Sequence, residues 1–166
     1  MAVLAGLLCG CQMEETMETV SDEWVVPAMA EPREIFVRLP DGAAIPVLQQ
    51  DDRQLYIAQD HEIMLETFSS GDLHTTIRTL SGYEKEQLTV CKTRQGDADR
   101  YDFVWTAAGE EGLQLGRACI LDDGNYHYTL STLAQEQASG ALQKTFSDMY
   151  DSCKLISPEV NLRTGS

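Results

Sequence analysis

Beyond residue 34 the hydrophobic positions recur with two different periods. One places them at alternate residues, which is typical of strands, and the other at every third or fourth residue, which is typical of helices. Short strands are predicted at residues 35–39, 44–49, 55–57 and 63–65. A helix is predicted next over residues 73–80, because its apolar residues return on one face. Ser70 or Asp72 can cap the start of this helix, and Gly82 suits the left-handed position at its end.

Four further strands are predicted at regular spacing, at residues 86–93, 100–106, 113–121 and 126–133. The connectors between them are rich in turn residues, and the segment 122–125 contains Asp-Gly, a strong hairpin signal. Strands joined in this way form an antiparallel meander. In the second of these strands Tyr101, Phe103 and Trp105 share one face, which we assign to the core.

An amphipathic helix is predicted over residues 134–153, where apolar side chains recur every three or four positions. Thr132 and Gln135 have the spacing of a capping box at its start. The predicted fold class is therefore α+β, an antiparallel sheet packed with helices. Pro158 and a polar end predict a flexible tail at residues 156–166.

Length and composition indicate one globular domain. The chain has 166 residues, 43% hydrophobic and 23% charged, which excludes a wholly disordered or collagen-like chain. No apolar run reaches the roughly 20 residues that a membrane-spanning helix needs. The formal net charge of -15 argues against nucleic acid as a partner, because phosphate backbones are bound mainly by Lys and Arg.

The start of the chain carries a targeting motif. A short apolar stretch is followed by Leu8-Cys9-Gly10-Cys11, which resembles the lipobox of bacterial lipoproteins. The resemblance implies that residues 1–10 are a signal peptide and that Cys11 carries a diacylglyceryl group as the mature N-terminus. The protein would then be anchored to the cell membrane on its extracytoplasmic side.

Two further points concern this region, namely its missing basic start and an alternative interpretation. A signal peptide needs a basic start, and the first basic residue is Arg33, so we expect the true translation start to lie upstream. Alternatively, residues 2–9 form a buried first strand, in which the cysteines are small apolar residues.

Residues 11–34 are predicted to be an acidic linker between the anchor and a domain spanning residues 35–155. Seven of the linker's side chains are acidic against one basic side chain, Arg33. Such a segment buries too little apolar surface to offset the entropy of ordering it. Within it, Trp24-Val25-Val26 is apolar enough to dock on the domain as a short edge strand.

The order of elements, with the last strand Tyr126-His127-Tyr128-Thr129-Leu130 and the helix end Ser152-Cys153-Lys154-Leu155, resembles the PsbP-like superfamily over residues 35–155. The resemblance implies an antiparallel sheet between helices, and bacterial members are often lipoproteins. Members often have Phe where this chain has Cys153. No catalytic motif of that family can be carried over, so the resemblance concerns the fold and leaves function open.

Beyond the signal region three cysteines remain, Cys91, Cys119 and Cys153. Cys91 and Cys119 fall on the first and third strands of the meander, about 10 Å apart at a strand spacing of ~4.8 Å, which is too far for a disulfide. We predict three free thiols in buried, small-residue roles. No Cys or His pair has the short spacing of a zinc site, so no metal or other cofactor is expected.

The histidines are His61, His74 and His127, and we expect them to be ordinary exposed side chains. The alternative is a lipid-anchored hydrolase or metal-dependent enzyme that uses His74 or His127 with nearby carboxylates. Residues 122–125 offer oxygen ligands but lack the acid spacing of a calcium loop, so we interpret them as a turn.

Aromatic residues supply the candidate ligand site, at Trp105, Tyr126 and Tyr128. Facing outward they would form a surface for a ligand or partner; facing inward they belong to the core, which the alternation of Tyr126, Tyr128 and Leu130 favours. The function predicted from the sequence is a membrane-anchored, non-enzymatic domain that binds a protein or small molecule or assists envelope assembly.

Overall fold

One antiparallel sheet of seven strands organises the chain, in the order β2-β3-β4-β8-β7-β6-β5. The structure is a computed structural model that describes residues 30–41, 43, 45–69, 71–110 and 112–156. The strands of the sheet are β2 (Leu48–Gln49), β3 (Arg53–Ile57), β4 (His61–Ser69), β5 (Cys91–Gln95), β6 (Ala98–Gly109), β7 (Gly112–Asp122) and β8 (Tyr126–Gln135). A separate two-stranded sheet pairs β1 (Ile35–Phe36) with β9 (Lys154–Leu155).

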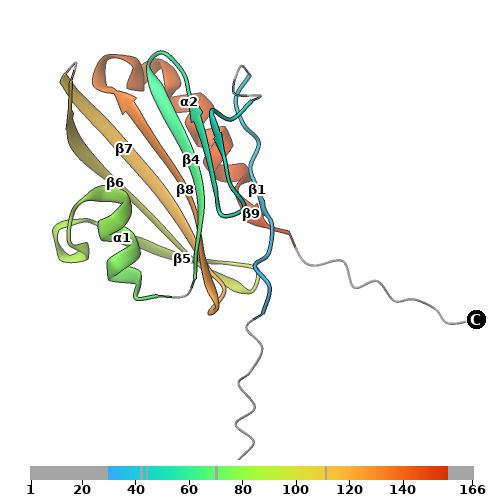
Figure 1. Cartoon of the computed structure of the whole chain (residues 1–166). Coiled ribbons are helices and arrows are strands. Elements are labelled where there is room, and N and C mark those ends of the chain that lie inside the picture. The colour runs from blue at the N-terminus through green and yellow to red at the C-terminus, as the bar shows by residue number, and fades with distance from the viewer. Residues whose placement is uncertain (1–29, 42, 44, 70, 111, 157–166) are drawn as a thin grey trace, which may run out of the picture.

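Helices cover both faces of the large sheet (Figure 1). They are α1 (Leu73–Ser81), the short 3-10 helix η1 (Lys85–Gln87) and α2 (Glu136–Ser152). On the α1 side the core contains Ile77, Tyr101, Phe103, Trp105, Ala118 and Ile120. On the α2 side it contains Tyr56, Ile63, Cys119, Leu121, Tyr128, Leu130, Ala134, Phe146, Met149, Tyr150 and Cys153. The α+β class and the antiparallel meander predicted from the sequence are therefore confirmed.

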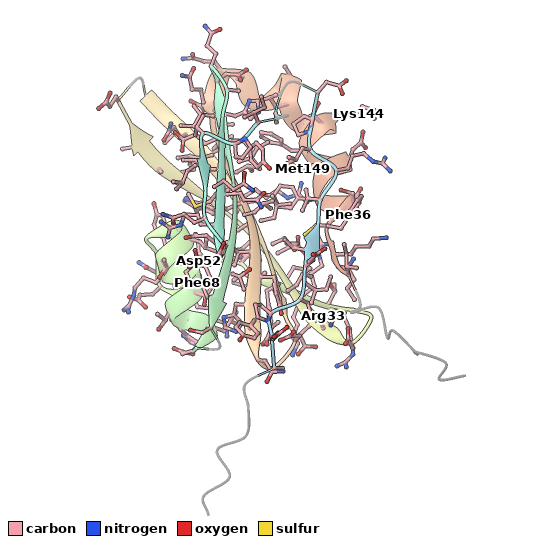
Figure 2. The ribbon with its side chains drawn as sticks, turned by 45° about the vertical axis from the view of Figure 1, so that its right-hand side comes forward. Arg33, Phe36, Asp52, Phe68, Lys144 and Met149 are labelled. Carbon is pink, nitrogen blue, oxygen red and sulfur yellow. The ribbon has the colours of Figure 1, made fainter. Side chains whose placement is uncertain are left out.

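The ends and faces of the helices follow from local chemistry. Asp72 caps α1, because its carboxylate accepts a hydrogen bond from the His74 backbone N–H at 3.3 Å. Gly82 ends α1 with φ of 76°, in the left-handed region. On α2, Met149 points toward the sheet and is buried, whereas Lys144 lies on the outer side (Figure 2).

Two hairpins of the meander depend on glycine. Between β5 and β6 the turn is tight, with Gly96 at φ of 65°, as the first central position of a type II′ turn requires. Between β7 and β8, Gly124 adopts φ of 89° and donates its N–H to the Asp122 carboxylate at 2.8 Å. The predicted Asp-Gly turn is thus confirmed.

Several element boundaries differ from the prediction. Residues 86–93 are not one strand: Glu84 and Gln87 form a reciprocal capping box that starts η1, and β5 begins only at Cys91. The last helix starts at Glu136, because β8 continues to Gln135. Thr132, predicted to cap that helix, lies within β8.

The two ends of the domain also differ from the sequence pattern. Of the predicted strands 35–39 and 44–49, only the residues of β1 and β2 pair. Strand β9 was not predicted, because its partner β1 is more than a hundred residues away in the sequence. Ile156, assigned to the tail, donates its N–H to the Glu34 carbonyl at 2.8 Å.

The predicted signal peptide at 1–10, the predicted lipidation site Cys11, Trp24-Val25-Val26 and residues 157–166 lie outside the described residues. From the linker assigned to 11–34, Arg33 contacts the domain: its backbone N–H donates to the Tyr128 hydroxyl at 2.8 Å and its guanidinium pairs with Asp97 at 2.9 Å. None of the helices in the described chain is long and apolar enough to span a bilayer.

Candidate ligand-binding site

Half of β6 is an open edge of the sheet. Strand β5 pairs only with Ala98–Asp102, so from Phe103 to Gly109 the outer edge of β6 has no strand neighbour among the described residues. Tyr83, which follows α1, reaches this edge and donates its hydroxyl to the Thr106 carbonyl at 2.9 Å. The open edge leaves room beside the sheet that the helices do not fill.

A cavity of about 540 Å³ lies at this open edge, within the size range of small-molecule sites. The sheet, α2 and the segment after α1 supply its walls. Its lining residues are Tyr83, Gln87, Leu88, Val104, Trp105, Thr106, Leu115, Gly116, Arg117, Thr132, Ala134, Ser139 and Phe146. This set is mostly apolar with a few polar groups, which is the composition of ligand pockets in general.

Arg117 of β7 supplies the charge in this cavity. Its guanidinium lies over the Tyr150 ring, 4.1 Å from the ring centroid, in a cation–π contact. No carboxylate of the described residues lies within ion-pairing distance of it. An aromatic ring holds the side chain in place, and no residue in the described part of the chain accepts a hydrogen bond from its guanidinium.

Tyr150 anchors this arrangement from α2. Its hydroxyl donates to the Arg117 carbonyl at 2.6 Å and lies 3.0 Å from the Thr132 hydroxyl. Burial raises the pKa of Tyr150 well above its usual value, so the phenol stays neutral. Three elements, α2, β7 and β8, are therefore tied together beneath the cavity.

The structure separates the three aromatic residues predicted to bind ligand. Trp105 lines the cavity at β6. Tyr126 lines a second cavity of about 650 Å³, between residues 32–35 and strands β3 and β4. Tyr128 is fully buried, 6.0 Å from the Tyr126 ring between centroids, as the core interpretation expected.

The second cavity is a poorer candidate although it is larger. Charged side chains line much of it, and several already have partners: Arg53 pairs with Glu66, and Arg33 pairs with Asp97. The two arginines are therefore engaged, and the other charges of the lining are the carboxylates of Glu34, Asp51 and Asp52, so this cavity is more polar than the one at β6. The cavity at β6 combines a mostly apolar lining with Arg117, which forms no ion pair with a described residue, so we take it as the candidate site.

The histidines form no common centre among the described residues. His74 lies 3.3 Å from the Glu86 carboxylate, whereas Nδ1 of His127 lies 2.7 Å from the Thr76 hydroxyl. His127 is 3% exposed and the His61 side chain is 12% exposed, so the expectation that they are exposed was wrong. The His127 side of β8 faces α1, and His61 packs edge-on against the Phe146 ring. No three His, Cys, Asp or Glu side chains of the described chain are grouped to hold a metal ion.

The cysteines Cys91, Cys119 and Cys153 are free, as predicted. Cys91 and Cys119 both lie opposite Asp102, on either side of β6, which confirms the separation by one strand. Cys119 and Cys153 are fully buried, but Cys91 is exposed, contrary to expectation. Cys91 lies on the edge strand β5, where nothing described covers it.

Of the residues that line the cavity, Trp105 was among the predicted ligand-site residues, whereas Arg117 and Phe146 were not. One signal in the sequence could have indicated Arg117: it is the single charged residue between Gly112 and Leu121, in a strand that is otherwise mostly apolar. Phe146 was recognised only as part of an amphipathic helix. The meeting of β6, β7 and α2 at one edge has no local signature, so this cavity could not be inferred.

No family model matches the sequence, and no curated protein is significantly similar to it. Solved structures that are similar in fold include the following three. A protein from Bacteroides thetaiotaomicron VPI-5482 superposes with a TM-score of 0.50 at 10% identity, over 74% of this chain and 45% of that one. LpqN of Mycobacterium tuberculosis, described as involved in cell envelope biogenesis, gives 0.51 at 10% identity, over 77% of this chain and 87% of LpqN. Cyanobacterial PsbP (CyanoP) of Synechocystis sp. PCC 6803 gives 0.48 at 11% identity, over 76% and 84%.

At these identities the likeness concerns the fold alone. The chain spans less than half the length of the Bacteroides protein. LpqN is matched over most of its length by residues of this chain. This chain is therefore similar in its α+β architecture to a mycobacterial envelope protein.

Proposed function

We propose that this protein is a non-enzymatic binding domain of the bacterial cell envelope, which takes up a small molecule in the cavity at β6. The observation that carries the proposal is the cavity itself, apolar and placed where the sheet edge is open. An open edge normally has to be covered or protected in a soluble protein. A ligand here would cover part of the exposed Val104 and Leu113 side chains nearby.

The envelope location rests on two independent observations. The sequence Leu8-Cys9-Gly10-Cys11 resembles a lipobox, and the fold is similar to that of LpqN, which is involved in cell envelope biogenesis. A diacylglyceryl group on Cys11 supplies two chains, which anchor a protein stably where one chain would not. The acidic linker would then hold the domain away from an anionic membrane surface.

A neutral apolar probe tests uptake by the cavity. N-phenyl-1-naphthylamine gains fluorescence in an apolar site, and we expect the protein to bind it. Ser139→Trp places a large side chain in the cavity from α2 and should abolish the signal. The matched control is Gln143→Trp, on an exposed part of the same helix outside the lining. Equal binding by both variants would remove this cavity as the site.

Mass spectrometry of the membrane fraction tests the anchor. We expect a mature chain that begins at Cys11 and carries a diacylglyceryl group, and Cys11→Ala should release the protein from the membrane. Cys9→Ala serves as the control and should leave anchoring intact. A mature protein that keeps residues 1–10, or an unmodified Cys11, contradicts the anchor.

A further inference from the structure

The charge of the cavity lining is opposite to that of the chain. The protein has 27 Asp and Glu against 12 Lys and Arg, yet the described residues that line the cavity include no carboxylate and one cation, Arg117. A ligand with a cationic group would meet an unpaired guanidinium there. The lining therefore favours an anionic ligand, although the net charge of the protein is negative.

Arg117 is prepared to bind an anion. Its ring contact with Tyr150 and the backbone pairing of β7 with β6 and β8 hold it at the cavity. Among the described residues no acceptor is hydrogen-bonded to its guanidinium. A planar guanidinium presents paired donors that match a carboxylate or a phosphate, and its interaction is strongest where water is partly excluded.

We propose that the ligand is a small anionic amphiphile, whose apolar body fills the cavity beside Leu115 and Phe146 and whose carboxylate or phosphate pairs with Arg117. This inference rests on the proposed function, because it names the ligand class of the same cavity. The volume of about 540 Å³ and the mostly apolar lining suit a hydrocarbon body. The single cation suits one anionic head.

Calorimetry with four probes, each below its micelle concentration, tests the charge preference. Dodecanoate and dodecyl phosphate carry the two candidate heads, dodecyltrimethylammonium carries the opposite charge, and dodecanol carries none. We expect at least one anion to bind about tenfold or more tightly than the cation, which corresponds to the ~1.4 kcal/mol per decade of affinity. The comparison between the two anions shows whether a carboxylate or a phosphate is preferred.

Two sets of variants locate the preference. Arg117→Gln should weaken anion binding about tenfold or more and leave dodecanol unchanged, whereas Arg94→Gln, at an exposed arginine outside the lining, should change neither. Val104 lines the cavity and is 64% exposed, so substitutions there are compatible with folding. Val104→Glu should weaken anion binding and Val104→Lys should keep or strengthen it. Circular dichroism confirms that each variant is folded.

The outcomes separate this inference from the proposed function. Binding of dodecanol or the naphthylamine probe without preference for anions overturns the inference and leaves the cavity's role standing. The inference is also overturned if Arg117→Gln does not weaken anion binding, or if Val104→Glu and Val104→Lys bind anions equally well. In both cases the cavity's role as a binding site still stands. Absence of binding by every probe overturns both.

Discussion

Trp105 packs directly over Gly116, its partner on the neighbouring strand, so closely that a Cβ at residue 116 would lie 2.1 Å from Cε2 of the indole. The two residues are paired across β6 and β7 and both line the candidate cavity. The absence of a side chain at residue 116 is therefore what gives the indole its position.

Gly116→Ala should destabilise the protein by about 1–3 kcal/mol, because the indole or the strands must move to admit the methyl group. Chemical denaturation measures the change, and the fluorescence of Trp105 should report the displaced ring. Gly140→Ala is the control: residue 140 lies on α2 with nothing within 4 Å of an added Cβ. That variant should be more stable by roughly 0.5–1 kcal/mol, since alanine favours helix. Equal effects of the two substitutions would contradict the packing described.

Tyr150→Phe should lower the free energy of unfolding by about 1–3 kcal/mol. The change removes the hydroxyl that donates to the Arg117 carbonyl at 2.6 Å and leaves buried polar groups with fewer partners. Tyr83→Phe also removes one hydrogen bond to a carbonyl, that of Thr106, but at a site open to water, where solvent replaces the lost partner. We expect the second variant to cost less than the first in urea denaturation, and the reverse order would argue against the network beneath the cavity.

Stability should decline in alkali because two tyrosines are buried in their neutral form. Burial raises the pKa of Tyr128 from 10.0 to about 12 and raises that of Tyr150 as well. As pH rises above 10, tyrosines of the unfolded chain lose their protons before these two do in the fold, so unfolding becomes more favourable. The stabilisation is complete below pH 10 and is lost progressively toward pH 12.

Melting temperatures measured across this pH range check the sign. Tyr128→Phe should make the decline shallower without removing it, because Tyr150 still contributes. Absorbance of the phenolate should show two tyrosines titrating later than the others. A melting temperature that rises between pH 10 and 12 is incompatible with this account.

The three cysteines of the domain should differ in how fast they react with a thiol reagent. Cys91 is exposed, whereas Cys119 and Cys153 are fully buried. A hydrogen bond with Cys153 and burial together raise the pKa of the Cys119 thiol, so little of the reactive thiolate forms. N-ethylmaleimide should label Cys91 rapidly in the native protein and the other two only after denaturation, as peptide mapping would show. Labelling of Cys119 at the rate of Cys91 would mean that the core opens readily.

The large sheet was predictable because its longer strands carry their own signals. Tyr101, Phe103 and Trp105 alternate on β6, and Gly96 and Gly124 mark hairpins whose geometry needs a positive φ. The two-residue strands β1, β2 and β9 were not predictable in their extent, since so short a segment has no period. The capping box formed by Glu84 and Gln87 was not recognised in the sequence, where residues 86–93 were predicted as one strand.

Of the three lining residues Trp105, Arg117 and Phe146, only Trp105 was among the predicted ligand-site residues. Trp105 stood out as an aromatic residue of an alternating strand, although it was grouped with Tyr126 and Tyr128, which lie elsewhere. Arg117 and Phe146 reach the cavity from β7 and α2. Their meeting depends on how α2 packs against β7, where Tyr150 contacts Arg117, and packing between elements this far apart in the sequence has no local signature.

The pairing of β1 with β9 brings residues near the beginning and the end of the described domain to one small ribbon (Figure 1). Because its two ends lie side by side, such a domain suits insertion into a surface loop of a host protein. It also suits circular permutation, in which the two ends are linked and the chain is opened at another turn, while the meander keeps its register. The close approach of the two ends is the geometry that insertion into a host protein and circular permutation require.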